Sequence, residues 1–200
     1  MLQNNNAIVL LSGGLDSIAL AYWKRPRFAI TIDYGQNAAA AELKAASAVA
    51  ESLKMQHVII KSDCSSLGAG IMSQNGSIES SPSPEWWPFR NQLIITLAAM
   101  RAIRLGVKEL LVGSVKDDCN YVDGTSAFYD LIDHLMAAQE GGIKVSAPAI
   151  NMSTEELIQV SGVPRSLLLW AHSCNRGNIP CGVCPSCVKY RAIRAHLGIV

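Results

Sequence analysis

A short polar loop carries the densest set of residues in this chain that could do chemistry. Residues 12–17 read Ser-Gly-Gly-Leu-Asp-Ser and directly follow the apolar run from Ala7 to Leu11. Two adjacent glycines allow the backbone to turn tightly and to approach a ligand closely. The amide N–H groups of such a turn, and of a helix after it, converge on one point and attract an anion, to which the Ser12 and Ser17 hydroxyls can add hydrogen bonds. The segment therefore predicts a phosphate-binding loop.

Two common phosphate-binding loops do not fit this segment. The glycines are not followed by the Gly-Lys-Ser/Thr run of a Walker loop, and the spacing is not that of the Gly-x-Gly-x-x-Gly dinucleotide turn. The remaining alternative to a binding loop is an ordinary serine-rich turn between a strand and a helix.

The end of the chain carries a second set of chemically active residues. Four cysteines form a C-x6-C-x2-C-x2-C array: Cys174, Cys181, Cys184 and Cys187. Spacings of two residues let consecutive thiolates turn towards one ion, and a fourth ligand completes a tetrahedron. We expect structural zinc, with an iron–sulfur cluster and redox-active thiol pairs as the alternatives. The site would tie a terminal helix over residues 186–196 to the rest of the protein. His172 we place beside the site or in the core, not among the ligands.

Composition excludes several classes of protein. The chain has 200 residues, half of them hydrophobic, and a formal net charge of +1, which gives no electrostatic footprint for nucleic acid. No apolar stretch approaches the ~20 residues that a membrane span needs, and residues 1–6 lack the features of a secretory signal. We expect a cytoplasmic protein, in which Cys64 and Cys119 are free thiols.

The elements that must position these residues alternate along the chain. Apolar runs predict strands over residues 7–11, 28–33, 57–60 and 109–113, and helical periodicity predicts helices over residues 37–54, 91–105 and 126–139, with a capping box at 153–156 opening a further helix. Alternating strands and helices indicate an α/β fold with a doubly wound, parallel, Rossmann-type sheet. Ligands of such sheets bind at the carboxyl ends of the strands, where the loop, Asp33 and residues 114–117 all lie.

Two irregular regions complete the organisation. Residues 64–88 are rich in Ser, Gly, Pro and Asn and have no period, so we interpret them as a long mobile loop, either a lid or a disordered segment. The composition changes after Pro164. We therefore divide the chain into a main domain over residues 1–165 and a zinc-binding helical tail over residues 166–200 that packs on it.

The loop at residues 12–17 resembles the PP-loop of the ATP pyrophosphatases, and three further segments narrow the resemblance. They are Asp33-Tyr34-Gly35-Gln36, then Pro88-Phe89-Arg90-Asn91, and finally Asp117, Tyr121, Asp123 and Phe128 in the register D-x3-Y-x-D-x4-F. Together with the four cysteines they resemble the 7-cyano-7-deazaguanine synthase family, over residues 7 to about 195.

The resemblance implies an enzyme, an ATP-dependent carbon–nitrogen ligase that forms AMP and pyrophosphate. The family transfers AMP from Mg-ATP to 7-carboxy-7-deazaguanine, lets ammonia displace the AMP, and dehydrates the resulting amide to the nitrile. The expected cofactors are ATP, Mg²⁺ and structural Zn²⁺. The expected partners are a small deazapurine carboxylate and an amine, with no nucleic acid and no membrane, and the family tends to form homodimers.

The resemblance also assigns residues to this chemistry. The catalytic candidates are Ser12, Asp16 and Ser17, and the nucleotide-binding set is Ser12, Gly13, Gly14, Leu15, Asp16, Ser17 and Asp33. The substrate side would comprise Trp87, Arg90, Asn91, Asp117, Tyr121 and Asp123. Three alternatives stay open: a helix cap at residues 90–91, a solvated loop at the aspartates, and a hydrophobic plug at residues 86–87.

Four positions depart from the family pattern. Phe89 replaces a glycine and should crowd that wall of the site, Gly124 and Thr125 replace a Cys-Arg pair, and Thr154 replaces a common lysine. The missing arginine and lysine remove two cations from a site that handles anions. With the crowded wall at Phe89, the lost arginine suggests a second hypothesis: a divergent paralogue, like those of bacterial defence systems, that adenylates a deazaguanine carboxylate and couples it to another amine, such as a protein amine. A third hypothesis is a nucleotide-binding module without catalysis.

Overall fold

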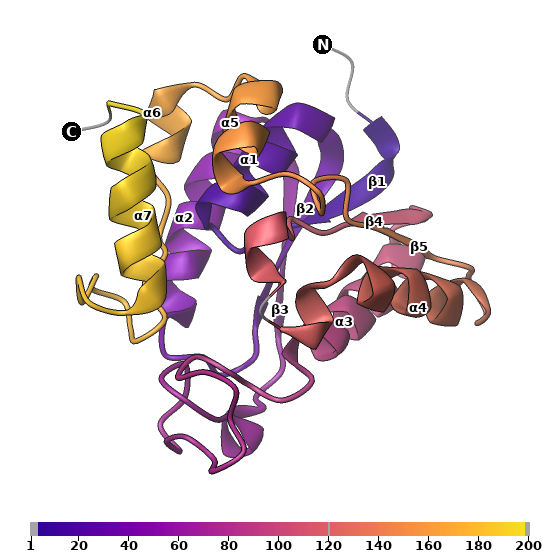
Figure 1. Ribbon diagram of the computed structural model, residues 1–200. Coiled ribbons are helices and arrows are strands. Elements are labelled where there is room, and N and C mark those ends of the chain that lie inside the picture. Colours follow the sequence, from indigo (N-terminus) through magenta and orange to yellow (C-terminus); the bar gives the residue numbers. More distant parts are fainter. Residues whose placement is uncertain (1–3, 120, 199–200) are drawn as a thin grey trace.

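A five-stranded parallel sheet forms the centre of the computed structural model, which describes residues 4–119 and 121–198 (Figure 1). The strand order is β3-β2-β1-β4-β5, with every neighbouring pair parallel. The strands are β1 (Asn4–Leu10), β2 (Pro26–Asp33), β3 (Gln56–Lys61), β4 (Glu109–Leu111) and β5 (Lys144–Ser146). The chain runs outwards from β1 to β3 and then returns to the other side of β1. A crevice therefore opens between the ends of β1 and β4, the place where ligands bind in such sheets.

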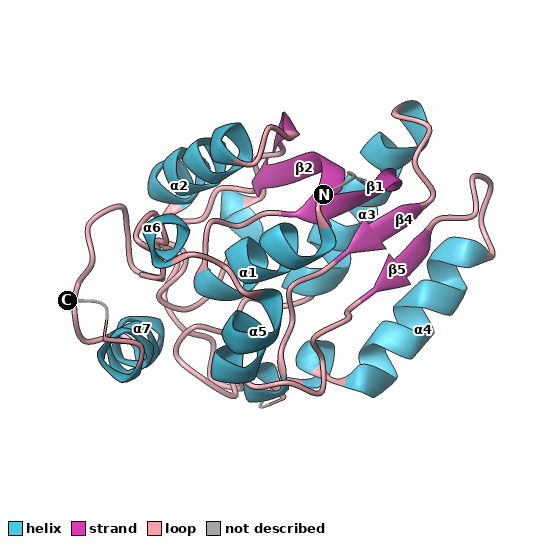
Figure 2. Cartoon of the chain, turned by 90° about the horizontal axis from the view of Figure 1, so that it is seen from above, coloured by secondary structure: helices cyan, strands magenta, loops and turns pink. Residues whose placement is uncertain are grey.

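Helices cover both faces of this sheet (Figure 2). They are α1 (Leu15–Lys24), α2 (Ala39–Ser52), α3 (Arg90–Arg104), α4 (Ser126–Ala137), α5 (Thr154–Ser161), α6 (Arg165–Leu168) and α7 (Pro185–His196), with three short 3-10 turns, η1 (Ser65–Leu67), η2 (Lys116–Asp118) and η3 (Val122–Gly124). Helices α3 and α4 pack on one face, and α1, α2, α5, α6 and α7 supply the core on the other. None of the described helices is long and apolar enough to cross a membrane.

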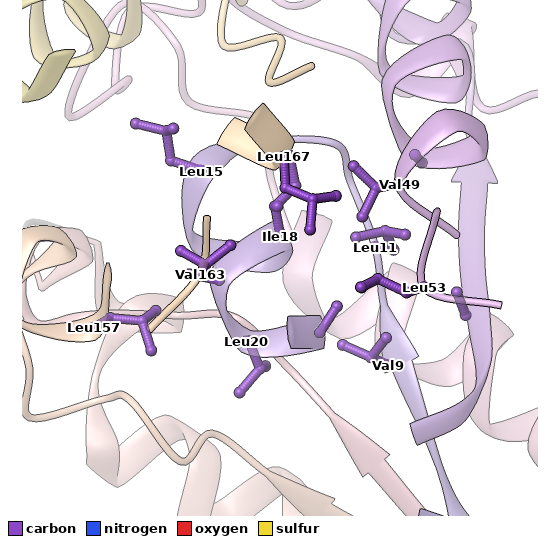
Figure 3. Packing of buried hydrophobic residues seen from close by; sticks show 14 of the residues in the cluster. Val9, Leu11, Leu15, Ile18, Leu20, Val49, Leu53, Leu157, Val163 and Leu167 are labelled. Atoms are coloured by element: carbon purple, nitrogen blue, oxygen red, sulfur yellow. The ribbon is translucent and has the colours of Figure 1, made fainter. Parts of the chain in front are cut away.

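Alternation along β1 divides the core into two layers. Val9 and Leu11 face the layer of α1 and α2, whereas Ile8 and Leu10 face the layer of α3 and α4. Figure 3 shows how Ile18 of α1 packs beside Leu11 in the first layer. Both layers contain fully buried apolar side chains, as expected for a parallel sheet that is covered by helices on both faces. The sheet therefore holds the loop at residues 12–17 rigidly at its carboxyl edge.

The structure confirms the predicted fold class, a doubly wound α/β sheet. The four predicted strands and the predicted helices are present with small shifts in their ends, and Ser153 forms the predicted capping box with Glu156. Two short elements were not predicted: the edge strand β5 and the helix α6.

The segment over residues 64–88 is folded against the sheet. Gly70 and Gly76 form an antiparallel bridge, and Ile71 N–H donates to Pro84 O at 2.8 Å. The Trp87 ring is 3% exposed and packs edge-on against Tyr34, with ring centroids 5.0 Å apart. The segment is therefore a long irregular loop with ordered contacts, as opposed to a disordered one, and Trp87 acts as a hydrophobic plug; a role as a mobile lid stays a prediction.

Phe89 at the start of α3 adopts a left-handed backbone conformation, with φ 56° and ψ 19°. Its side chain is 77% exposed and does not line the pocket described below, so it does not crowd the wall of the site as expected. A bulky side chain in this conformation costs about 1–2 kcal/mol relative to right-handed backbone. The strain arises where the family pattern has a glycine.

We expect Phe89→Gly to raise the free energy of unfolding by about 0.5–1 kcal/mol, because glycine removes the strain but gains conformational freedom in the unfolded chain. Urea denaturation measures this difference. The control is Phe89→Ala, which keeps a Cβ in the left-handed conformation. A glycine variant no more stable than the alanine variant would contradict the strain argument.

Candidate active site

The phosphate-binding loop follows β1 directly, and its hydroxyls are held close together. Ser12 Oγ lies 3.2 Å from Ser17 Oγ, and Ser17 Oγ donates to Gly14 O at 3.0 Å. Gly13 has φ 81°, and a Cβ on it would lie 2.8 Å from the carbonyl oxygen of Glu42 on α2. A side chain at Gly13 would therefore push the loop away from the helix, which explains the glycine in steric terms.

A cavity of about 320 Å³ opens over this loop at the carboxyl ends of the strands. Its lining includes five of the predicted loop residues, namely Ser12, Gly14, Leu15, Asp16 and Ser17, and two predicted substrate residues, Arg90 and Asn91. Gly113 follows β4 and packs so closely that a Cβ on it would lie 3.1 Å from the Ser17 backbone. The close contact brings the loop after β4 to the same cavity.

Asp16 sits at the N-terminus of α1 in an environment with little solvent. Its Oδ1 is buried and has no hydrogen-bond partner among the described residues. Burial raises the pKa of the Asp16 carboxyl to about 6, although Lys189 and the Thr154 hydroxyl favour the charged form. A carboxylate that is incompletely satisfied by the protein and faces a cavity is suited to bind a cation.

A second group of carboxylates follows β4. Asp117 Oδ2 accepts a hydrogen bond from Thr154 N–H at 3.2 Å, and Asp118 Oδ2 accepts one from Val115 N–H at 3.1 Å. Burial raises the pKa of Asp118. Lys189 Nζ lies 3.7 Å from Asp16 Oδ2 and 3.4 Å from Asp117 Oδ2, so one ammonium group bridges the loop and the second group.

Arg90, Tyr34 and Glu42 also line the cavity. Among the described residues, no carboxylate lies within 4.0 Å of the Arg90 guanidinium. Burial alone would lower the pKa of Arg90, but Tyr34, Asp123 and Glu42 together raise it. A half-buried cation without a paired carboxylate can bind an anionic group of a ligand.

Several predicted site residues support the cavity without lining it. Asp123 and Asn91 bind each other: Asn91 Nδ2 donates to Asp123 O at 2.8 Å and Asn91 N–H to Asp123 Oδ2 at 3.4 Å, so this pair caps α3. Tyr121 donates to Glu85 Oε1 at 2.7 Å and thereby holds the 64–88 segment. Asp33 accepts from Gly35 N–H at 3.2 Å. The predicted site residues that do not line the cavity are Gly13, Asp33, Trp87, Asp117, Tyr121 and Asp123.

The positions that depart from the family pattern have structural roles. A Cβ on Gly124 would overlap the carbonyl oxygen of Asp118. Thr125 caps α4, because its Oγ1 accepts from Phe128 N–H at 3.3 Å and donates to Val122 O at 2.7 Å. Thr154 is fully buried at the start of α5. These side chains do not supply the cations that the family pattern has there.

The four predicted metal ligands come together. The sulfur atoms of Cys174, Cys181, Cys184 and Cys187 all lie within 4.8 Å of one another. The sulfurs of a tetrahedral zinc site, with Zn–S of about 2.3 Å, fit within this spread, whereas an iron–sulfur cluster distributes its cysteines over two or more irons and needs a wider one. Backbone N–H groups donate to three of the sulfurs at 3.4 Å. Backbone hydrogen bonds from Val183 and Cys184 lower the pKa of Cys181 to about 6. The array therefore fits zinc.

Helix α7 starts at the cysteine array and forms one wall of the cavity. Cys184 is the N-cap of α7, and Ser186, Lys189, Tyr190 and Ile193 line the cavity from one face of that helix. Upstream, His172 N–H donates to Gly13 O at 2.9 Å, and its ring contacts Gly177 O at 3.0 Å. The cysteine-rich tail is thus part of the site as well as a support for the fold.

Comparison with known proteins gives a single family for this arrangement. The sequence model described as "Queuosine biosynthesis protein QueC" matches residues 6–195. The chain belongs to the QueC family. It is 31% identical to 7-cyano-7-deazaguanine synthase of Desulforudis audaxviator, over 96% of this chain and 97% of that protein. It is 29% identical to the synthase of Methanothermobacter thermautotrophicus, over 96% of each chain. The resemblance stated from the motifs is therefore confirmed.

Two charged residues of the cavity lining, Lys189 and Glu42, were not predicted from the sequence, because neither lies in a motif. Tyr34 also lines the cavity, and it lies in the Asp33-Tyr34-Gly35-Gln36 segment without having been assigned to the site. The spacing 186, 189, 190 and 193 along α7 is that of one helix face, and it is the signal that could have indicated Lys189.

The raised pKa of Asp16 makes the stability of the nucleotide-free protein depend on pH. An unfolded Asp loses its proton near pH 4, whereas Asp16 keeps it to about pH 6. Between these values the folded state binds more protons, so the stability contributed by Asp16 falls as the pH rises and is lost above pH 6. We expect Asp16→Asn to become more stable than the parent protein across this window, by about 1–3 kcal/mol at pH 7.

Urea denaturation of both proteins from pH 4 to pH 8 measures this difference. Subtracting the two curves removes the contribution of Glu42, whose pKa burial also raises, and leaves that of Asp16 together with its repulsion from Asp118. A difference that stays constant with pH would contradict the buried, protonatable Asp16.

We expect Cys184→Ser to reduce bound zinc from about one ion per chain to a small fraction, because it removes one of four ligands. The variant should also expose α7 to trypsin, because a serine can still cap the helix but loss of the metal releases the start of α7 from Cys174 and Cys181. Elemental analysis and limited proteolysis test both effects, with Cys119→Ser, at an exposed free cysteine, as the control. Iron in place of zinc, or full zinc retention in Cys184→Ser, would contradict the assignment.

Proposed function

We propose that this protein activates the carboxylate of 7-carboxy-7-deazaguanine with ATP and converts it to the nitrile 7-cyano-7-deazaguanine. The observation that carries the proposal is the convergence of the phosphate-binding loop and the unpaired Arg90 on one cavity at the sheet edge. Membership of the QueC family supports the choice of substrate, because its curated relatives carry the name 7-cyano-7-deazaguanine synthase.

The first step is transfer of AMP. A carboxylate oxygen of the substrate attacks the α-phosphorus of ATP, the bond from that phosphorus to the bridging oxygen breaks, and pyrophosphate leaves. We assign the loop amides and the Ser12 and Ser17 hydroxyls to the pyrophosphate, where oriented donors stabilise the charge that develops on the leaving group. Mg²⁺ would neutralise charge on the phosphates, and we assign its protein contact to Asp16.

The second step exchanges oxygen for nitrogen. The lone pair of ammonia attacks the adenylated carbonyl carbon, AMP departs with the carbon–oxygen bond pair, and loss of a proton gives the amide. A second ATP then activates the amide oxygen, and departure of AMP with loss of the remaining N–H protons gives the nitrile. We assign Arg90 to the substrate carboxylate and Asn91 to its orientation, with Asp117 near the nucleotide through its contact with Lys189. Asp123 holds Asn91, Trp87 O accepts from Arg90 N–H at 3.3 Å, and we assign Tyr121 and Asp33 to support of the segments around the cavity.

A second candidate uses the same activation and a different amine. It is favoured by the structural roles of Gly124, Thr125 and Thr154, which leave the substrate side without two cations of the family pattern. In this case the adenylate is transferred to another amine, for example one on a protein. A nucleotide-binding module without catalysis is the third hypothesis.

Incubation of the zinc-loaded protein with Mg-ATP, 7-carboxy-7-deazaguanine and ammonium separates these hypotheses. We expect the products AMP, pyrophosphate and nitrile. An assay of released pyrophosphate and mass spectrometry of the products detect them. Pyrophosphate and adenylate without nitrile would overturn the first candidate in favour of the second. Absence of any pyrophosphate would contradict both.

The carboxylate assignment has its own test. Arg90→Met should raise the KM for 7-carboxy-7-deazaguanine by more than about tenfold, which corresponds to loss of one charge-assisted contact. The matched control is Arg104→Met, an exposed arginine at the other end of α3. Equal effects of the two variants would remove Arg90 from the substrate side.

A further inference from the structure

One cation, Lys189, stands among the carboxylates next to the phosphate-binding loop. Its Nζ lies 3.7 Å from Asp16 Oδ2 and 3.4 Å from Asp117 Oδ2, and about a third of its side chain is exposed. Among the described residues, no other lysine, arginine or histidine nitrogen lies within 4.0 Å of either carboxylate. Among the described residues, Lys189 is therefore the only positively charged side chain close to Asp16 and Asp117.

The position of Lys189 is fixed from two sides. It projects from the face of α7 that lines the cavity, together with Ser186, Tyr190 and Ile193, and α7 is anchored at its start by the cysteine array. On the other side, Asp117 Oδ2 is also bound by Thr154 N–H at 3.2 Å. The ammonium thus bridges the loop after β1 and the loop after β4.

Charge balance gives this arrangement a consequence for ligand binding. Asp16, Asp117 and Asp118 place three carboxyl groups around the loop. ATP with its magnesium is an anion, and carboxylates without a counter-ion would repel it. A lone divalent cation, in contrast, would be attracted to the same carboxylates.

We propose that Lys189 is a positioning residue for the activation step: its ammonium group holds Asp16 and Asp117 in place and keeps free divalent cations from occupying them before Mg-ATP binds. The inference rests on the proposed function, because it assigns Asp16 and Asp117 to the nucleotide side of the cavity. Lys189 acts through these two carboxylates, and neither bond making nor bond breaking is assigned to it.

The test measures binding, so that it does not require turnover. The first probe is Mn²⁺ alone, and electron paramagnetic resonance of the free ion measures its binding. The second probe is Mg²⁺ with α,β-methylene-ATP, an analogue that cannot release pyrophosphate, and calorimetry measures its binding. We expect Lys189→Met to bind Mn²⁺ at least about tenfold more tightly and the analogue about tenfold more weakly, each close to the effect of one charge contact. Lys189→Arg keeps the charge and should restore both affinities to within about threefold.

Two controls separate this role from a merely structural one. Lys144→Met removes an exposed lysine that also pairs with a carboxylate, Glu109 at 3.8 Å, and should leave both affinities unchanged. Zinc content and thermal stability of every variant show whether α7 stays anchored. An unchanged Mn²⁺ affinity in Lys189→Met, an unchanged affinity for the analogue, or failure of Lys189→Arg to restore them with zinc retained would overturn the proposal.

Failure of the proposed function would look different. If the parent protein releases no pyrophosphate from Mg-ATP with 7-carboxy-7-deazaguanine, the reaction assignment is wrong, yet opposite shifts of the two affinities in Lys189→Met would still support Lys189 as the residue that sets the charge of the loop.

Discussion

The site depends on how closely the backbone can pack at the carboxyl end of β1. The absence of side chains at Gly13 and Gly113 lets the phosphate-binding loop approach α2 on one side and the end of β4 on the other. Because of these two contacts, the loop amides, the Ser17 hydroxyl and the residues after β4 share one cavity at the point where the strand order reverses. A larger residue at Gly13 would push the loop away from α2, and one at Gly113 would push it away from the residues after β4.

The cysteine array extends this constraint to the far end of the chain. Its four sulfurs lie close enough for one ion, and the helix that begins there presents Lys189 and Tyr190 to the cavity. His172 N–H ties the same tail to Gly13 O. Metal binding in the tail and ligand binding at the loop should therefore be coupled, since both need α7 in one position. A structural metal can act on chemistry in this way without touching the substrate.

Much of the fold follows from local patterns, and what was missed depends on distant contacts. The buried strands and amphipathic helices have clear periodicity, whereas β5 has only three residues and a single apolar one, Val145. The 64–88 segment has no period, because its order comes from burial of Trp87 against Tyr34 and from the bond between Tyr121 and Glu85. The loop at residues 12–17 and the cysteines were predicted since each set is contiguous or closely spaced. Lys189 was missed because only the fold brings α7 to Asp16.

The distribution of charge in the cavity bears on how two anionic substrates could be ordered. Near the loop, the carboxylates and Lys189 form a compensated group that suits a magnesium-bound phosphate chain. Arg90, which lines the same cavity, donates to Asn91 Oδ1 at 3.3 Å and has no carboxylate within 4.0 Å among the described residues. The positions that lack the cations of the family pattern, Thr125 and Thr154, lie in backbone caps and helix starts. Because no described carboxylate lies within 4.0 Å of Arg90, whereas Lys189 is already paired with Asp16 and Asp117, a ligand carboxylate would gain more at Arg90 than at Lys189.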